Sequence, residues 1–252
     1  MSTNIGMEEN MFISYLNKYR NDILGNDTDN GICYDGPVDK LKFLERENRL
    51  LFLLKETNGN DNDGKRNTSF NDWNYMEWVH QQATQEKPLY RSVYRNIVMW
   101  SKMFEVFSDE KREPSISEFI DSNGLIINSN ILNSLLNVSI INLKKSWGNE
   151  KTDWESMNNY LNDNVIRKEI LKYQISELKP TLVLCGGTFD FSYNIFGDGS
   201  DIKTITTNNG QIVKFFEHDA TIFVNCYHPS KPRWSRRDSF IHMSNILKTI
   251  YM

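Results

Sequence analysis

The sequence has few of the residues that build disulfide frameworks or metal sites. Its three cysteines, Cys33, Cys185 and Cys226, are odd in number and far apart, and no two have the CxxC spacing of a zinc knuckle. We expect all three to be reduced thiols, as is usual in the cytoplasm. The four histidines are also scattered, so the sequence predicts no bound metal and no cofactor.

Long apolar runs are absent as well. No stretch approaches the roughly 20 apolar residues that a membrane-spanning helix needs, and the start MSTNIGMEEN lacks the basic and apolar parts of a secretion signal. The formal net charge of −4 argues against a protein that coats nucleic acid through bulk electrostatics. These absences predict a cytoplasmic protein with no membrane partner.

The composition is typical of a folded globular domain. Hydrophobic residues make up 39% and aromatic residues 12% of the 252 residues, which is enough for a packed core. We expect a single domain over residues 1–252, in which residues 1–45 form a helical extension and a loop. We also expect a monomer.

Short apolar runs alternate with amphipathic stretches, in the order typical of a parallel sheet. Runs too short for helices, which suit buried strands, lie at 50–54, 138–143, 181–185 and 220–226. Helices are expected at 7–24, 73–84, 89–107, 153–178 and from residue 236 onward, and a hairpin is expected to turn at 208–210. The sequence therefore predicts a three-layer α/β/α fold with a central, mainly parallel, four-stranded sheet.

Three of these strands end in polar residues. Glu56 follows the first strand, Asn142 lies at the exit of the second, and His228 follows the last. Because ligands of open α/β sheets bind outside the carboxyl ends of the strands, we expect these three side chains to face one site. The remaining strand ends in Cys-Gly-Gly, which lets the backbone approach closely but adds no reactive side chain.

Taken in order, four segments resemble motifs of the uracil-DNA glycosylase superfamily. They are KETNG at 55–59, IINLKKS at 140–146, KPTLVLCGG at 179–187 and YHPS at 227–230, within a match over about residues 45–235. The similarity is nearest to the branch whose first motif reads Gly-Glu-Ala-Pro-Gly and whose last reads His-Pro-Ser or His-Pro-Ala. It implies a DNA glycosylase that flips a damaged or modified base from the DNA, hydrolyses its N-glycosidic bond and leaves an abasic site.

The resemblance assigns catalysis to Glu56, Asn142 and His228. A neutral His228 would stabilise the departing base, Glu56 would support the cationic sugar or orient water, and Asn142 would read the base edge. Asp61 and Asp63 are alternatives for the role of Glu56. The substrate site would also include Thr57, Asn58, Gly59, Tyr227 and Ser230.

Basic residues near two of the motifs are candidates for contacts with DNA phosphates. They are Lys144, Lys145, Lys231, Arg233, Arg236 and Arg237. The alternative interpretation of the run after the His-Pro-Ser sequence is a solvated helix start. DNA, either duplex or single-stranded, is the expected partner.

The chain departs from the family pattern at several places. The first motif begins with glycine and has proline at its fourth place in the family, where this chain has Lys55 and Asn58. Thr57 stands where other branches have an aspartate or asparagine that positions water. The nearest branch also holds an iron–sulfur cluster on four cysteines, and a chain with three is expected to hold none.

These departures leave two alternatives to a glycosylase. One is a catalytically inactive nucleic-acid-binding module on the same fold, and the other is a hydrolase of small nucleotides. The base also stays open between a uracil-type base and a hypermodified pyrimidine of the kind found in phage DNA. The role is accordingly repair or defence against phage.

Overall fold

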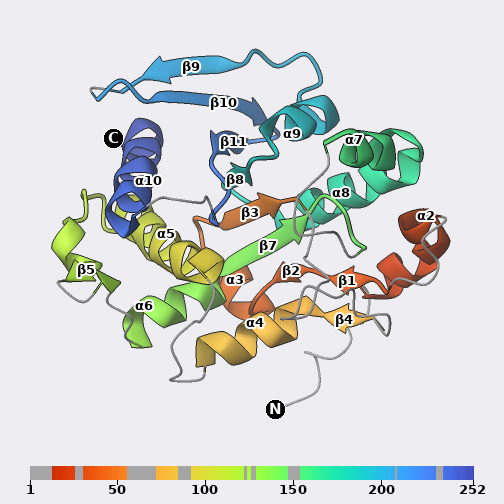
Figure 1. The fold of residues 1–252 in the computed structure, drawn as a ribbon, viewed down its shortest axis with the longest axis horizontal. Helices are drawn as coiled ribbons and strands as arrows, with labels where there is room; N and C mark the ends of the chain where they lie inside the picture. The colour runs from red at the N-terminus through yellow and green to blue at the C-terminus, as the bar shows by residue number, and fades with distance from the viewer. Residues whose placement is uncertain are drawn as a thin grey trace. The chain divides into compact units, whose positions relative to one another are not determined.

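The computed structural model describes residues 13–25, 31–55, 72–84, 92–121, 124–125, 129–146, 154–207, 209–230 and 235–252. These residues form an α/β protein, as predicted (Figure 1). The chain forms two compact units. The first consists of Met1–Asp35, Lys55–Tyr75 and Asn142–Glu177, and the second of Gly36–Leu54, Met76–Ile141 and Leu178–Met252.

A seven-stranded mixed sheet, in the order β2-β7-β3-β8-β11-β10-β9, is the frame of the second unit. Strands β3 (Leu50–Leu54), β8 (Leu182–Gly186) and β11 (Thr221–Cys226) run parallel. Leu182 fixes their register, since it pairs with Leu50 on one side and with Ile222 on the other. Figure 1 draws the arrow of β7 (Val138–Asn142) in the same direction as that of β3.

The prediction of a four-stranded sheet was wrong. The four expected strands are the centre of the sheet, and the expected hairpin extends it: β10 (Ile212–His218) pairs antiparallel with β11, and β9 (Lys203–Thr206) pairs antiparallel with β10. The seventh strand, β2 (Gly36–Pro37), pairs antiparallel with β7. A hairpin signal does not reveal which sheet edge the hairpin joins, and two residues are too few to give a periodic pattern.

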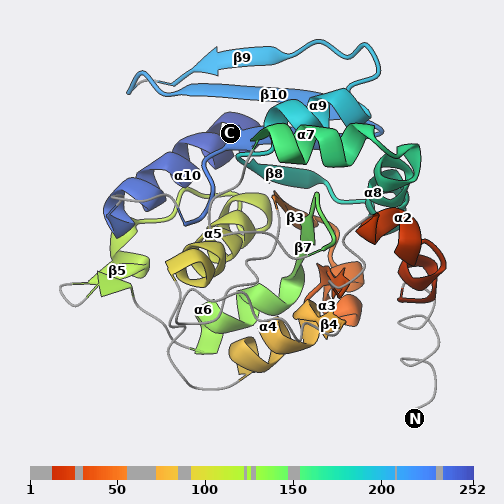
Figure 2. The same cartoon turned by 45° about the vertical axis from the view of Figure 1, so that its right-hand side comes forward.

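Helices α5 (Ser92–Ser108) and α10 (Arg236–Tyr251) pack against each other in the second unit (Figure 2). The indole Nε1 of Trp100 on α5 donates to Oγ of Ser239 on α10 over 3.1 Å. A capping box starts α10, because Oγ of Ser235 accepts from the backbone N of Asp238, whose carboxylate accepts from the backbone N of Ser235. Among the described helices, none is long and apolar enough to cross a membrane.

The other elements that lie wholly or mainly in the second unit are short. They are helices α3 (Lys40–Glu45), α4 (Tyr75–Thr84), α6 (Ser129–Asn133) and α9 (Phe189–Phe196), 3-10 turns at Ile116–Glu118 and Ser134–Asn137, and the antiparallel pair β5 (Ile120–Asp121) and β6 (Gly124–Leu125).

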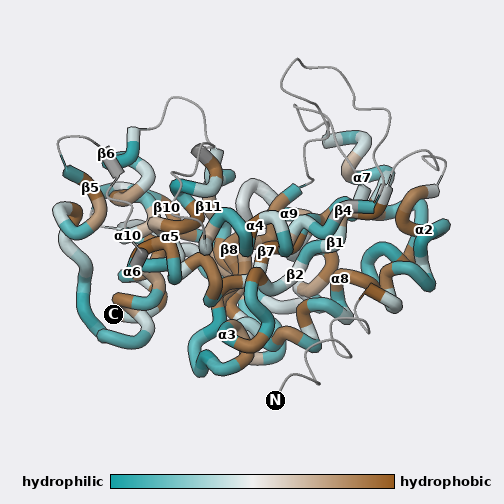
Figure 3. Tube along the Cα trace, turned by 90° about the horizontal axis from the view of Figure 1, so that it is seen from below, coloured by the Kyte–Doolittle hydropathy of each residue, from teal (hydrophilic) through white to brown (hydrophobic). Residues whose placement is uncertain are grey.

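Burial explains the composition of the central strands. Every residue of β3, β7 and β8 is buried. Strands covered on both faces have continuous apolar runs rather than alternating ones, and the centre of the sheet is accordingly brown in Figure 3. This is why these strands were recognisable in the sequence.

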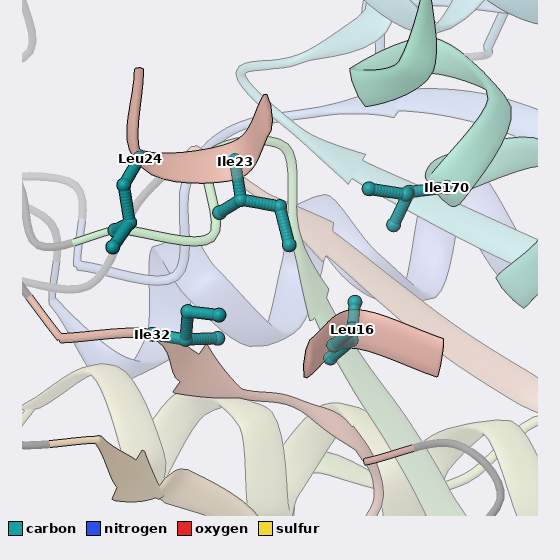
Figure 4. Packing of buried hydrophobic residues seen from close by; sticks show 5 residues of the cluster. All are labelled: Leu16, Ile23, Leu24, Ile32 and Ile170. Carbon is teal, nitrogen blue, oxygen red and sulfur yellow. The ribbon is translucent and has the colours of Figure 1, made fainter. Parts of the chain in front are cut away.

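The first unit contains α2 (Arg20–Leu24), α7 (Trp154–Asn162), α8 (Val165–Leu178) and a parallel pair of β1 (Cys33–Tyr34) and β4 (Trp73–Asn74). Helix α2 ends at Leu24 and is followed by Gly25, whose φ of +57° suits glycine. Figure 4 shows the small core of this unit, in which side chains from α2, α8 and the neighbouring segments converge. Its members are Leu16, Ile23, Leu24, Ile32 and Ile170.

Two helices, α7 and α8, replace the single helix predicted for 153–178. Helix α7 ends at Asn162 and α8 begins at Val165. Between them, Oδ1 of Asn164 accepts from the backbone N of Ile166 over 2.9 Å. Asn and Asp side chains compete with helical hydrogen bonds in this way, so the run 162–164 interrupts the helix although the apolar pattern continues on both sides.

Candidate functional site

The carboxyl ends of β3 and β8 form a topological switch point in the second unit. Along the chain, the next strand of the sheet after β3 is β7, on one side, whereas β8 is followed by β9, β10 and β11, which all lie on the other side. The connections therefore leave two neighbouring strands in opposite directions. Ligands of open α/β sheets bind in the crevice at such a point.

Gly186, the last residue of β8, allows three segments to meet at this point. A Cβ added to Gly186 would lie 2.7 Å from Cδ2 of Leu54, 3.3 Å from Cδ of Pro229 and 3.6 Å from Cα of His228. A side chain at this position would force the end of Leu54 to shift and would crowd the ring of Pro229, so glycine is favoured here. The Cys-Gly-Gly end of the strand thus brings the His-Pro-Ser sequence against the end of β3.

His228 is held in one tautomer by Ser230. Nδ1 of the imidazole lies 3.2 Å from the backbone N of Ser230 and 2.7 Å from its Oγ. A backbone N–H only donates, so Nδ1 accepts, and the proton of the neutral imidazole is on Nε2. In this tautomer His228 can donate a hydrogen bond from Nε2.

Asn96 on α5 braces the same turn. Its buried amide donates from Nδ2 to the carbonyl oxygen of Pro229 over 2.5 Å, and its Oδ1 accepts from Nη1 of Arg236 over 2.9 Å. Burial lowers the pKa of Arg236, and the positive charge of Arg95 lowers it further. Arg236, which we expected to contact phosphate, is thus partly buried and uses one donor inside the protein. The sequence did not single out Asn96, because it lies in a helix whose pattern indicates core packing.

Asn142 lies in the first unit, in a buried polar cluster around Asp35. Oδ2 of Asp35 accepts from the backbone N of Asn142 over 2.6 Å and from its Nδ2 over 3.3 Å, and Oδ1 accepts from Nε2 of Gln174 over 3.0 Å. Nζ of Lys145 lies 2.8 Å and 2.9 Å from the two carboxylate oxygens. The side chains of Asp35 and Lys145 are 0% and 2% exposed. The carboxylate of Asp35 thus binds the last residue of β7, a side chain of helix α8 and a buried lysine.

This cluster differs from what the sequence predicts for two residues. Lys145, expected at a DNA phosphate, instead faces a carboxylate of the protein in a buried ion pair. Burial lowers the pKa of Lys145, and the charge of Asp35 opposes that shift. Asn142 is 2% exposed, and its Nδ2 already donates to Asp35. Asp35 was missed because it lies in a turn-rich segment, and Gln174 because a single polar residue within a helix carries no signal.

The other predicted site residues divide between the described and the remaining parts of the chain. Tyr227 is 49% exposed, and Ser230 and Arg237 are exposed in the second unit. In the first unit, Nζ of Lys144 lies 5.7 Å from the ring centroid of Tyr160. Outside the described residues are Glu56, Thr57, Asn58, Gly59, Asp61, Asp63, Lys231 and Arg233.

An open hollow of about 240 Å³ adjoins Tyr227 in the second unit. The ring of His242 lies 4.9 Å from that of Tyr227, and Nε2 of His242 accepts from the backbone N of Tyr227 over 3.3 Å. Gln211, Asp238 and Ile241 complete the lining. Two rings, one aliphatic side chain and one carboxylate suit contact with a flat, partly polar molecule.

Two of the cysteines are not activated thiols, and the described residues offer no cluster of metal ligands. Burial raises the pKa of Cys185 to about 12, and it raises the pKa of Cys226 well above the ordinary value for a thiol. Both side chains therefore stay protonated and inert. No three His, Cys, Asp or Glu residues of the described ranges gather where they could hold a metal ion.

Assignment of this site depends on its own geometry. Comparison of the chain with models of known protein families, with curated proteins and with solved structures gave no match.

Proposed function

We propose that the chain is a DNA glycosylase that hydrolyses the N-glycosidic bond of a flipped base and leaves an abasic site. The observation that carries this proposal is the His228 turn at the carboxyl end of β11, in which Ser230 holds the imidazole with its proton on Nε2. The base leaves as an anion, and a neutral N–H donor placed beside it stabilises that developing charge. A pyrimidine, either uracil-type or hypermodified, is the expected substrate.

The brace around the turn supports this role. A donor lowers the barrier most when it is held in place before the reaction, so that no reorganisation is needed as charge develops. Asn96 fixes the carbonyl of Pro229, and Gly186 lets Pro229 pack closely against the end of β8. The carbonyl and the ring of Pro229 are thus both held in place, and this fixes the backbone next to His228.

Glu56 and Asn142 have different standing in the proposal. Glu56 is the second residue after β3 in the sequence, and we assign it the support of the cationic sugar or the orientation of water. Asn142 donates from Nδ2 to Asp35, so we assign the decisive hydrogen bond to the departing base to His228. The order of the four motifs along β3, β7, β8 and β11 also supports a uracil-DNA glycosylase-like fold, with these strands as its core.

Release of a base by the purified protein tests the proposal. Single-stranded and duplex oligonucleotides that carry uracil, deaminated purines or phage-type modified cytosines are incubated with excess protein, and abasic sites are detected by alkaline cleavage. We expect cleavage of at least one substrate, and a loss of about 100-fold or more in rate for His228→Ala. His218→Ala, at the end of neighbouring β10, is the matched control and should keep the full rate. Absence of cleavage on every substrate would refute a glycosylase.

A hydrolase of small nucleotides is the second candidate. It is favoured because two basic side chains, Lys145 and Arg236, form contacts inside the protein. Lys145 is paired with Asp35, and Arg236 donates to Asn96, so neither is fully available to a DNA backbone. A small nucleotide needs fewer phosphate contacts than a duplex does. Turnover of free nucleotides that Arg237→Glu leaves unchanged would indicate this candidate. Salt-dependent DNA binding without base release would instead indicate the inactive binding module.

A further inference from the structure

Strand β9 ends the sheet of the second unit with an open edge. It pairs with β10 on one side, and within the described ranges no strand pairs with its other side; Figure 1 and Figure 2 both draw it as the outermost strand. All four of its residues are exposed. An edge of this kind presents backbone N–H and C=O groups to which another strand can be added.

The register of the hairpin determines which backbone groups face outward. The backbone N of Thr207 donates to the carbonyl oxygen of Gln211 over 2.9 Å, so these two residues form a hydrogen-bonded pair. Such pairs alternate along an antiparallel ladder, so Ile205 and Lys203 also bond to β10. The residues between them direct their backbone groups away from β10, and these are Ile202, Thr204 and Thr206.

This edge has limited protection against strand addition, since only its short length and one lysine oppose pairing. Natural edges carry charges, prolines or bulges that discourage pairing. The one charged residue of β9, Lys203, has its Nζ 2.6 Å from Oε1 of Glu217, so its charge is balanced within the hairpin. Ile202, Ile205 and Ile212 leave 42%, 41% and 60% of their surface exposed. A balanced charge and exposed isoleucines favour an apolar, extended partner.

We infer that β9 is a self-association surface, on which two copies of the chain pair their β9 strands antiparallel about a two-fold axis at Thr204. In this register Thr204 faces its counterpart, Ile202 faces Thr206 of the second copy, and Lys203 faces Ile205 of the second copy. Three hydrogen-bonded pairs then form, with about six bonds between the copies. The aliphatic part of Lys203 covers Ile205, and the two threonines at the axis form a favourable cross-strand pair.

Registers with the axis at Lys203 or Ile202 are less favourable. An axis at Lys203 would place two ammonium groups directly opposite each other, which destabilises a sheet. An axis at Ile202 would require the backbone N of Ser200, which already donates to the carbonyl oxygen of Gly197 over 2.5 Å. The strand pair alone buries less than the roughly 1,200–2,000 Å² of a stable interface, so the association is weak and depends on concentration. It departs from the monomer that we expected from the sequence.

Two cysteine variants test this register. Thr204→Cys places two Cα atoms about 5.5 Å apart across the axis, a separation that a disulfide spans. Thr206→Cys is the matched control, because its two copies would lie about 14 Å apart. The three natural cysteines are buried and do not compete. Under mild oxidation we expect Thr204→Cys to form disulfide-linked dimers at least about tenfold faster than Thr206→Cys does. Equal rates for the two variants, or no dimer from Thr204→Cys, would overturn the inference.

A proline variant tests the role of the outward backbone groups. Thr204→Pro removes an N–H that faces away from β10 and leaves the β9–β10 ladder intact. Two hydrogen bonds across the axis are lost, so sedimentation equilibrium should show a dissociation constant raised roughly tenfold. A wild-type chain that stays monomeric up to its solubility limit, or a proline variant that dimerises equally well, would contradict the inference. Neither measurement depends on base release, so the proposed glycosylase activity is tested separately.

Discussion

Replacing Lys145 by methionine leaves a buried carboxylate without its counter-charge. The variant keeps most of the side-chain volume, so the loss is mainly electrostatic. Asp35 retains three N–H donors, two from Asn142 and one from Gln174, which still support its charge. Removal of one partner of a buried ion pair costs about 3–5 kcal/mol, and because of the remaining donors we expect the lower end, about 3 kcal/mol.

Urea unfolding measures this cost. With a denaturant dependence of about 3 kcal/mol per molar urea for a chain of this size, the midpoint should fall by about 1 M. Tryptophan fluorescence and circular dichroism should be followed together, since a chain with two compact units need not unfold in one step. Lys145 belongs to the first unit, and the loss should appear in the transition of that unit.

Three further variants complete the test. Asp35→Asn should also destabilise the protein, and the double variant with Lys145→Met should cost less than the sum of the two single changes by about 0.5–3 kcal/mol. Lys248→Met removes an exposed ion pair with Glu113 and should cost less than about 1 kcal/mol. If Lys145→Met costs no more than this control, or if the two changes in the cluster are additive, the reasoning about a buried pair fails.

Three other outcomes are expected. Asn96→Ala removes the brace of the His-Pro-Ser turn, so it should cost about 1–3 kcal/mol in stability and lower kcat for base release with little change in KM, whereas a change in KM alone would argue against a positioning role. Gly186→Ala forces side chains at the end of β8 to shift, so calorimetry should show a loss of about 1–3 kcal/mol, and a raised melting temperature would contradict the close approach. The pKa of Asp72 is raised by burial but lowered more by its hydrogen bonds, chiefly from Arg20, so it ends below its ordinary value. The carboxylate therefore stabilises the protein above about pH 4 and loses this effect as the pH falls further, so Asp72→Asn should make acid unfolding less steep there, and an unchanged acid profile would count against the interaction.

The central strands were predictable because their physical cause is local. Burial on both faces requires apolar residues at consecutive positions, and the run at 50–54 coincides with β3. The break between α7 and α8 was missed, since the apolar pattern continues on both sides of Asn164 and only the hydrogen bond to Ile166 reveals the interruption. The attachment of the hairpin to β11 likewise depends on contacts that its own sequence does not encode.

The site divides in the same way. Ser230 is two residues from His228, so a short motif was enough to connect them. Asn96 and Pro229 are 133 positions apart, and Lys145 and Asp35 are 110 apart, so no local pattern predicts either contact. Lysine is almost always exposed, and Lys145 is buried only because a carboxylate from a distant segment faces it.

The same carboxylate has a consequence for synthesis of the chain. Asp35 emerges from the ribosome 110 residues before Lys145 and 139 residues before Gln174. At about 5–20 residues per second, synthesis of the 139 residues from Asp35 to Gln174 takes about 7–28 s. During that time the segment that contains Asp35 cannot complete its hydrogen bonds and ion pair, while the sheet strands that lie between Asp35 and these partners in the sequence are synthesised. In a nascent chain that stalls before residue 145, the carboxylate of Asp35 would therefore have no Lys145 to pair with. The first unit would then stay incompletely folded and accessible to quality-control proteases.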